Sequence, residues 1–277
     1  MTYDVIVIGG GPAGLSGAVA LGRALRSVLV IDSGAPRNAP AEGIHNFLTR
    51  DGMSPAEFRA AGQAEAERYG ATFDDGEVAS AERVDDHFLV TLADGDTRRG
   101  RRLLVTSGLV DELPDVPGLA ERWGRTVLHC PYCHGYEVRG KAIGVLGVSP
   151  RSAEQVRLWR QWSPDVLLLP ADEIDRVTDD GVRMTDGRLV ARDYLVTATR
   201  MVARAAFLGT LGLHPAEHPS GFGTYLPAVD PSGRTAVPGV WVAGNVADPA
   251  AQVITSAAAG LLAGAMINVD LLPPELV

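Results

Sequence analysis

The sequence predicts an α/β fold made of two three-layer domains, with the second domain inserted into the first. A strand, a glycine-rich turn, a helix and another strand follow one another within residues 3–32, which is the order of a βαβ unit. A similar plan starts again near Lys141 and closes on the segment LVTAT, which echoes the earlier segment LVTSG. This self-similarity indicates a nested duplication of one Rossmann-like unit.

The first domain is predicted from local signals along the chain. An apolar run enters the turn GGGPAG, and the small residues after it favour a closely packing helix. A second helix is predicted to begin at Pro55, because Ser54 is a suitable N-cap and Glu57 completes a capping box. Asp94 and Gly95 mark a hairpin. The predicted elements are strands 3–8, 27–31, 102–106 and 240–243, and helices 13–24, 54–69 and 251–269.

The second domain is predicted to contain strands 143–147 and 166–169, helix 152–162, a hairpin at Asp186-Gly187 and a closing strand at Leu195. Two proline-rich segments, DELPDVPG and HPAEHPSG, are plausible crossing points between the domains. They place the first domain at residues 1–112 and 218–277 and the second at residues 113–217.

The overall composition disfavours several classes of binding partner. The formal charge of -9 over 277 residues disfavours nucleic acid as a partner, because phosphate binding needs clustered Lys and Arg. The N-terminus has no basic n-region, and no run approaches the roughly 18 apolar residues of a membrane span. We therefore expect a cytoplasmic protein that does not bind a membrane. Two cysteines cannot complete a tetrahedral zinc site, and no metal is expected.

The turn GGGPAG carries the spacing GxGxxG on Gly9, Gly11 and Gly14. Gly9 is expected to make the tight turn, Gly11 to admit a pyrophosphate and Gly14 to let helix and strand pack closely. Asp32 follows the next strand, where a carboxylate accepts hydrogen bonds from an adenosine ribose. This order predicts a dinucleotide site but does not by itself distinguish FAD from NAD.

The segment HCPYCHGYE contains both cysteines, Cys130 and Cys133, two residues apart. A pair at this spacing can form a small-ring disulfide, and this geometry lowers the pKa of one thiol, which makes it a nucleophile. A neighbouring histidine can exchange the proton near neutral pH. The segment predicts thiol–disulfide chemistry, although two unconnected buried cysteines beside a structural histidine would show the same letters.

These motifs together resemble the low-molecular-weight thioredoxin reductase family. The resemblance rests on GGGPAG, HNF at His45 to Phe47, TSG at Thr106, the cysteine pair, and AGN followed by AQVITSA. The segment TAVPGVWVAGN also resembles the second flavin motif of two-dinucleotide-domain flavoproteins, with Asn245 where that motif has an acid. The resemblance implies a homodimer, FAD in the first domain and a degenerate nicotinamide-type second domain. The implied FAD residues are Gly9, Gly11, Pro12, Ala13, Gly14, Asp32, Asn46, Gly108, Gly244, Asn245, Gln252 and Val253.

Within that family, CPYCHGYE resembles the thioredoxin reductase-like dithiol oxidases that close disulfides in small natural products. The resemblance implies that Cys133 contacts the flavin and that Cys130 meets the substrate. His134 stands where the family usually has Asp, and it is implied as the acid/base group. A supporting role for His129 is left open beside a structural one. For Tyr136 and Glu137, a catalytic role and a role limited to shaping the loop are both left open.

The second nucleotide motif is degraded. The aligned segment is GVSPRS, in which Ser149 and Ser152 replace two glycines, and LLLPADE follows where the family has basic residues. The sequence therefore favours a dithiol oxidase that takes a small-molecule dithiol as substrate and molecular oxygen as final acceptor. Two alternatives remain: a disulfide reductase fed by ferredoxin or by unusually bound NADPH, and a non-enzymatic flavin and disulfide redox sensor.

Overall fold

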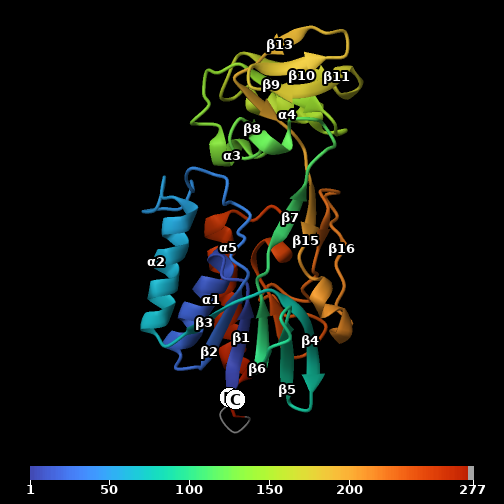
Figure 1. Cartoon of the computed structure of the whole chain (residues 1–277). Coiled ribbons are helices and arrows are strands. Elements are labelled where there is room, and N and C mark those ends of the chain that lie inside the picture. The colour runs from blue at the N-terminus through green and yellow to red at the C-terminus, as the bar shows by residue number, and fades with distance from the viewer. Residues whose placement is uncertain (274–277) are drawn as a thin grey trace. The chain divides into compact units, whose positions relative to one another are not determined.

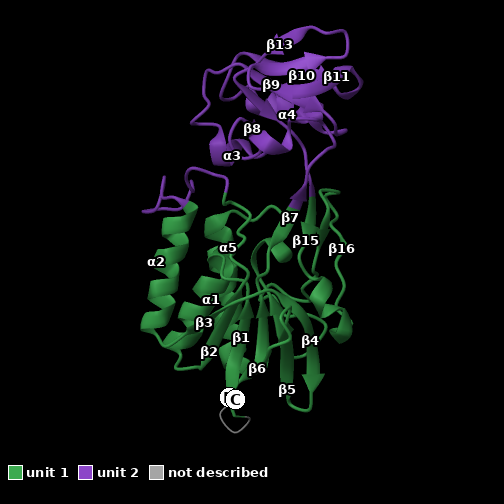
Figure 2. Cartoon of the chain, in the orientation of Figure 1, with its two compact units in different colours: residues 1–39, 55–110, 201–277 green, residues 40–54, 111–200 purple. Residues whose placement is uncertain are grey.

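The structure, a computed structural model, describes residues 1–273 (Figure 1). The chain divides into two compact units (Figure 2). The first unit holds residues 1–39, residues 55–110 and the chain from Met201 onward, and the second holds residues 40–54 and 111–200. Both units are built on parallel strands, and the second interrupts the first. The predicted α/β fold with an inserted Rossmann-like domain is confirmed.

The compact units differ from the predicted domains at two places. Residues 201–217 belong with the first unit, because Ala203, Leu208 and Leu213 are buried in the same cluster as the central strands. Residues 40–54 belong with the second unit, although the sequence on either side of them builds the first. Neither segment carries a local motif that reports its distant partners.

The first unit contains a seven-stranded sheet with the order β3-β2-β1-β6-β5-β4, and β18 pairs with β6. Strands β1, β2, β3, β6 and β18 run parallel, whereas β4 and β5 form an antiparallel hairpin joined to β6. The strands are β1 Thr2–Ile8, β2 Val28–Asp32, β3 Thr72–Asp75, β4 Val78–Val84, β5 His87–Leu92, β6 Thr97–Val105 and β18 Val240–Val242. The helices are α1 Pro12–Arg23, α2 Pro55–Arg68 and α5 Val253–Asp270, with the 3-10 helices η3 Ala206–Leu211 and η4 Gly244–Val246.

Strand β1 shows how the sequence places this sheet between two apolar layers. Its side chains alternate, so Val5 and Val7 join the cluster that contains α1 and α5, while Ile6 and Ile8 join the opposite cluster. All four are at most 4% exposed. Burial on both faces explains the continuous apolar run that predicts this strand.

Helices α1 and α5 pack unusually closely. A Cβ at Gly260 would lie 1.9 Å from the carbonyl oxygen of Ala13, and one at Gly264 would lie 2.9 Å from that of Gly17. By length and composition α5 is apolar enough to cross a membrane, although its 18 residues include the polar residues Thr255, Ser256, Asn268 and Asp270. One face of α5 belongs to the core, because it supplies Ala263 and Ile267 to the buried cluster around α1.

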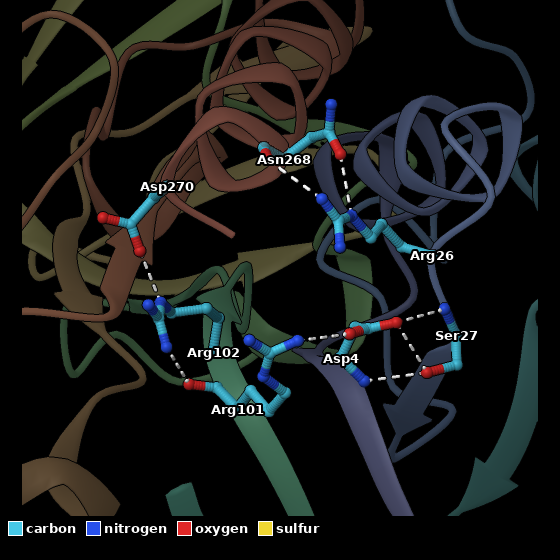
Figure 3. A network of polar contacts seen from close by, with 7 residues as sticks. All are labelled: Asp4, Arg26, Ser27, Arg101, Arg102, Asn268 and Asp270. Atoms are coloured by element: carbon cyan, nitrogen blue, oxygen red, sulfur yellow. Dashed lines mark hydrogen bonds and ion pairs between the residues drawn. The ribbon is translucent and has the colours of Figure 1, made fainter. Parts of the chain in front are cut away.

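A polar network secures the start of the sheet in the first unit (Figure 3). The Asp4 carboxylate accepts hydrogen bonds from the backbone and hydroxyl of Ser27 at 3.0 Å and from Arg101 at 3.0 Å. Burial opposes ionisation of Asp4, but these hydrogen bonds prevail and lower its pKa. Nearby, Arg26 Nε donates to Asn268 Oδ1 at 2.8 Å. The network joins the first two strands and links the α1–β2 turn to α5.

The second unit has a parallel sheet with the order β10-β9-β14-β8 and a separate antiparallel sheet, β11-β12-β13. Ile143 and Val145 of β9 pack on α4 through Val156 and Trp159, whereas Leu146 joins the cluster beneath the antiparallel sheet. The elements are β8 Val127–Leu128, β9 Ile143–Gly147, β10 Val166–Pro170, β11 Ile174–Thr178, β12 Gly181–Met184, β13 Leu189–Ala191, β14 Tyr194–Val196, α3 Pro131–His134, α4 Ser152–Trp159, η1 Ala120–Arg122 and η2 Ala171–Glu173.

Two small strand pairs complete the fold. Strands β7 and β15 pair where the chain leaves and re-enters the first unit, and β16 pairs with β17. Their bounds are β7 Leu109–Glu112, β15 Arg200–Ala203, β16 Ala216–Glu217 and β17 Thr224–Tyr225.

Candidate active site

The glycine turn of the first unit is shaped for close backbone contacts. Gly9 has φ +108°, and a Cβ there would lie 2.4 Å from the carbonyl oxygen of Thr106. At Gly14 a Cβ would lie 1.9 Å from the oxygen of Gly9, whereas at Gly11 it would meet no protein atom within 4 Å. Gly9 and Gly14 are thus required by the fold. The open side of Gly11, at the N-cap of the 12-residue helix α1, fits the approach of a pyrophosphate.

Asp32 ends β2 beside this turn, as the sequence predicts. Its Oδ2 accepts a hydrogen bond from Arg59 at 2.5 Å, and a Cβ at Gly10 would lie 2.9 Å from the same oxygen. Asp32 and Arg59 are only 16% and 34% exposed, so the ion pair is partly shielded from water. Sequence reasoning missed Arg59, because an arginine on a helix gives no sign of a partner on a distant strand.

The second cofactor motif is built around Asn245. Gly244 has φ +76°, and its Cβ would lie 2.9 Å from that of Ala13. The Asn245 amide nitrogen donates to the carbonyl oxygens of Asp248, Pro249 and Ala251 at 3.1, 3.3 and 2.9 Å. This side chain therefore holds its own loop in the approach to α5. Other predicted cofactor residues take backbone positions: Gly108 has φ +72°, Gln252 is the N-cap of α5 and Val253 begins that helix.

Replacing Asn245 by Asp is expected to damage this loop, because a carboxylate cannot donate and would face three carbonyl oxygens. The free energy of unfolding should fall by about 1–3 kcal/mol, measured by urea denaturation. Asn268→Asp is the matched control: the Asn268 oxygen accepts from Arg26, and an aspartate keeps that acceptor. Equal stability of Asn245→Asp and the wild type would contradict the role as a loop clamp.

The two cysteines lie at the start of a short helix in the second unit. Cys130 is the N-cap of α3 with extended backbone angles, φ -104° and ψ 117°, and Pro131 takes the first helical position. The Cys133 amide donates to the Cys130 carbonyl at 3.2 Å. Both side chains are half-buried. The two cysteines therefore lie within one short turn that is closed by this backbone hydrogen bond.

His134 completes α3 and is half-buried. Burial lowers its pKa, Glu137 partly opposes this effect, and His45 and His129 lower the pKa further. The imidazole is consequently neutral at pH 7 and able to accept a proton. Such a group next to a thiol has the protonation state that a general base needs.

The segment 40–54 reaches the cysteine motif within the second unit. Asn46 has φ +61°, and its amide nitrogen donates to the Tyr132 carbonyl, between the two cysteines, at 2.7 Å. His45 Nε2 lies 3.7 Å from Glu137 Oε1, and its Nδ1 lies 3.4 Å from Asp51. The structure thus gives Asn46 a role in holding the CxxC turn, and it adds His45 and Asp51 to the surroundings of that turn.

Comparison with known proteins identifies the family. Residues 3–171 match the family described as pyridine nucleotide-disulphide oxidoreductase. The chain belongs to this family. Thioredoxin reductase sirT of Leptosphaeria maculans is 30% identical over 318 residues, which cover 99% of this chain and 96% of the relative. Thioredoxin reductase tcpT of Claviceps purpurea (strain 20.1) is 32% identical, with coverage of 97% and 94%.

Solved structures agree with this assignment. The crystal structure of HlmI has a TM-score of 0.90 and 41% identity over 98% of this chain and 92% of its own. An oxidoreductase from Agrobacterium tumefaciens has a TM-score of 0.92 and 33% identity, with coverage of 99% and 100%. The resemblance to thioredoxin reductases is confirmed, and the chain is a thioredoxin reductase-like flavoprotein of the oxidoreductase class.

In this pyridine nucleotide-disulphide oxidoreductase, the degraded second nucleotide turn is closed by its own side chains. The Ser149 amide donates to Ser152 Oγ at 3.2 Å, and the Arg151 amide donates to Ser149 Oγ at 3.2 Å. Ser152 Oγ in turn donates to the Leu146 carbonyl at 2.9 Å, and the residue is 4% exposed. Two amides that would point at a dinucleotide phosphate in such a turn are therefore satisfied internally.

Proposed function

We propose that this protein is an FAD-dependent dithiol oxidase that converts a small-molecule dithiol into a disulfide through Cys130 and Cys133. The observation that carries the proposal is the serine-closed nucleotide turn in the same unit as a complete CxxC motif. The protein keeps the two cysteines that exchange electrons with thiols. The hydroxyl groups of Ser149 and Ser152, however, accept hydrogen bonds from two backbone amides that a nicotinamide cofactor would need. Electrons are therefore supplied by the dithiol.

The residues of the first unit fit FAD. The turn at Gly11 leaves room for a pyrophosphate, and Asp32, fixed by Arg59, is placed for the adenosine ribose. Bound there, FAD would accept an electron pair from the cysteines and pass it to molecular oxygen, which becomes hydrogen peroxide. Asn46 and Asn245 support neighbouring backbone, so we assign them to positioning the CxxC turn and the loop before α5.

The chain's own side chains divide the thiol chemistry between them. Cys130, at the N-cap of α3, receives the substrate sulfur, and Cys133 leaves as the thiolate when the enzyme disulfide breaks. His134 takes a proton from the attacking substrate thiol, because burial keeps its imidazole neutral. Overall, two substrate S–H bonds break and one S–S bond forms, while the Cys130–Cys133 bond accepts two electrons and the two protons.

The deciding experiment follows the flavin absorbance under anaerobic conditions. We expect dithiothreitol to bleach the visible absorption band of oxidised flavin and NADPH to leave it unchanged. Air should then restore the band with formation of stoichiometric hydrogen peroxide. A Cys130→Ser/Cys133→Ser double variant is the control and should not be bleached by dithiothreitol. Bleaching by NADPH would contradict the proposal.

A disulfide reductase is the second candidate, favoured by the names of the relatives sirT and tcpT. It would need electrons from ferredoxin or NADPH to enter the flavin. Bleaching by reduced ferredoxin, together with failure of dithiothreitol, would support it. A flavin and disulfide redox sensor would show no multiple turnover of any dithiol.

A further inference from the structure

Two tyrosines beside the redox cysteines are strongly exposed. Tyr132, between Cys130 and Cys133, is 60% exposed, and Tyr136 is 66% exposed. Tyrosine rings carry a large apolar area and are usually more deeply buried than this. Their exposure next to the reacting sulfur atoms therefore calls for a function other than packing of the core.

The Tyr132 ring is held in place although it is exposed. It meets the Trp162 ring edge to face, with centroids 5.8 Å apart and an interplanar angle of 89°. Trp162 is itself fixed between Trp159, at 6.1 Å, and Gly135, where a Cβ would lie 2.7 Å from the indole. Since Trp159 is fully buried, the stack is anchored in the core of the second unit.

The backbone of Tyr132 is fixed as well. Its carbonyl accepts the 2.7 Å hydrogen bond from Asn46, and the flanking cysteines share the Cys133 N to Cys130 O bond. Tyr132 therefore loses little conformational freedom when a ligand packs on its ring. A preorganised aromatic ring gives affinity at low entropic cost.

Tyr136 differs from Tyr132 in what covers its ring. The Arg139 guanidinium carbon lies 4.0 Å from the ring centroid, and Arg139 also donates to the Tyr136 carbonyl at 2.6 Å. One face of Tyr136 is thus taken by a cation. The Tyr132 ring, in contrast, meets the uncharged indole of Trp162, which makes it the better surface for an uncharged ligand.

We propose that Tyr132 is a substrate-binding residue that selects small, uncharged dithiols carried on a flat ring over charged peptide thiols. The ring of the substrate packs on Tyr132 while its first sulfur atom bonds to Cys130 and Cys133 leaves as the thiolate. The second sulfur atom of the substrate then attacks the first and displaces Cys130. The inference rests on the proposed dithiol oxidation and adds the substrate class to it. The chemical step is unchanged: substrate dithiol and enzyme disulfide become substrate disulfide and enzyme dithiol.

The test compares benzene-1,2-dimethanethiol, which has a flat ring, with dithiothreitol, which has none. For Tyr132→Ala, the ratio of kcat/KM for the ring dithiol to that for dithiothreitol should fall about 5- to 10-fold, the effect of one aromatic contact. Tyr132→Phe should restore the ratio. Tyr136→Ala should lower it less than twofold, and a loss equal to that of Tyr132→Ala would overturn the assignment.

A binding measurement separates this inference from the proposed function. The Cys130→Ser/Cys133→Ser variant, with and without Tyr132→Ala, is titrated with benzene-1,2-dimethanethiol, and binding is followed by tryptophan fluorescence, to which Trp162 beside Tyr132 contributes. Weaker binding without Tyr132 supports ring recognition even if the wild type oxidises no dithiol, in which case only the proposed function fails. Equal binding by both variants, or a wild-type preference for reduced glutathione over the ring dithiol, overturns the inference while leaving dithiol oxidation standing.

Discussion

Serine in place of Cys130 is expected to abolish dithiol oxidation, with a loss of roughly 10⁴-fold or more, as for other enzymes that lose their nucleophile. The substrate sulfur then has no disulfide to attack. Cys133 keeps its position in α3, where its amide bonds to residue 130 through backbone atoms alone. Its thiolate should therefore give a long-wavelength charge-transfer band with oxidised FAD, recorded by absorbance at pH 8.

The Cys133→Ser variant is the matched control for this assignment. It should lose turnover to the same extent but show no charge-transfer band, because it lacks the thiol that we propose to contact the flavin. A band in Cys133→Ser and none in Cys130→Ser would show that the two roles are reversed. Both substitutions replace one half-buried sulfur by oxygen, so a difference between them reports on position.

Most elements of both units could be predicted because their signals are local. The hairpin turns illustrate this: Gly95 has φ +93° and Gly187 has φ +85°, as the Asp-Gly pairs in the sequence indicate. The predicted helix at Pro55 and the strand ending at Ile8 begin and end where expected. In these segments the chemistry of four or five neighbouring residues is sufficient to choose the backbone conformation.

The contacts of residues 40–54 could not be predicted, because they depend on partners far along the chain. The motif HNF suggested a cofactor contact for Asn46, whereas its amide holds the Tyr132 carbonyl, 86 positions away. The Arg59 pairing with Asp32 was missed for the same reason. Sequence motifs identified which residues matter, but only the packed chain shows which atoms they touch.

Asn245 shows how a departure from a family motif becomes intelligible in the structure. In the sequence it is an amide where the related flavin motif has an acid. In the fold, the Asn245 amide nitrogen donates hydrogen bonds to three carbonyl oxygens of the following loop. A carboxylate could not donate these bonds. The asparagine at this position is therefore explained by the hydrogen bonds that it donates to the loop from Asp248 to Ala251.

Alanine in place of His134 is expected to lower kcat/KM for dithiols by roughly 10²- to 10⁴-fold, the usual effect of losing a general acid/base. In the wild type the acidic limb of the pH profile should lie below the ordinary histidine value of about 6.5, because burial lowers the pKa of His134. Protonation below that pKa removes the base, so activity is lost as the pH falls. The variant should lose this limb entirely, as measured from kcat/KM between pH 4.5 and 9.

Two neighbours of His134 should shift this limb in opposite directions. Glu137→Gln removes a carboxylate that raises the pKa of His134, so the limb should move to lower pH. His45→Gln removes a side chain whose electrostatic effect lowers the same pKa, so the limb should move to higher pH. His45 and Glu137 contact each other, so both variants remove the same loop contact. A purely structural disturbance of this loop would therefore shift the pH profile in the same direction in both variants. Opposite shifts identify His134 as the titrating base, and an unchanged profile in His134→Ala would rule it out.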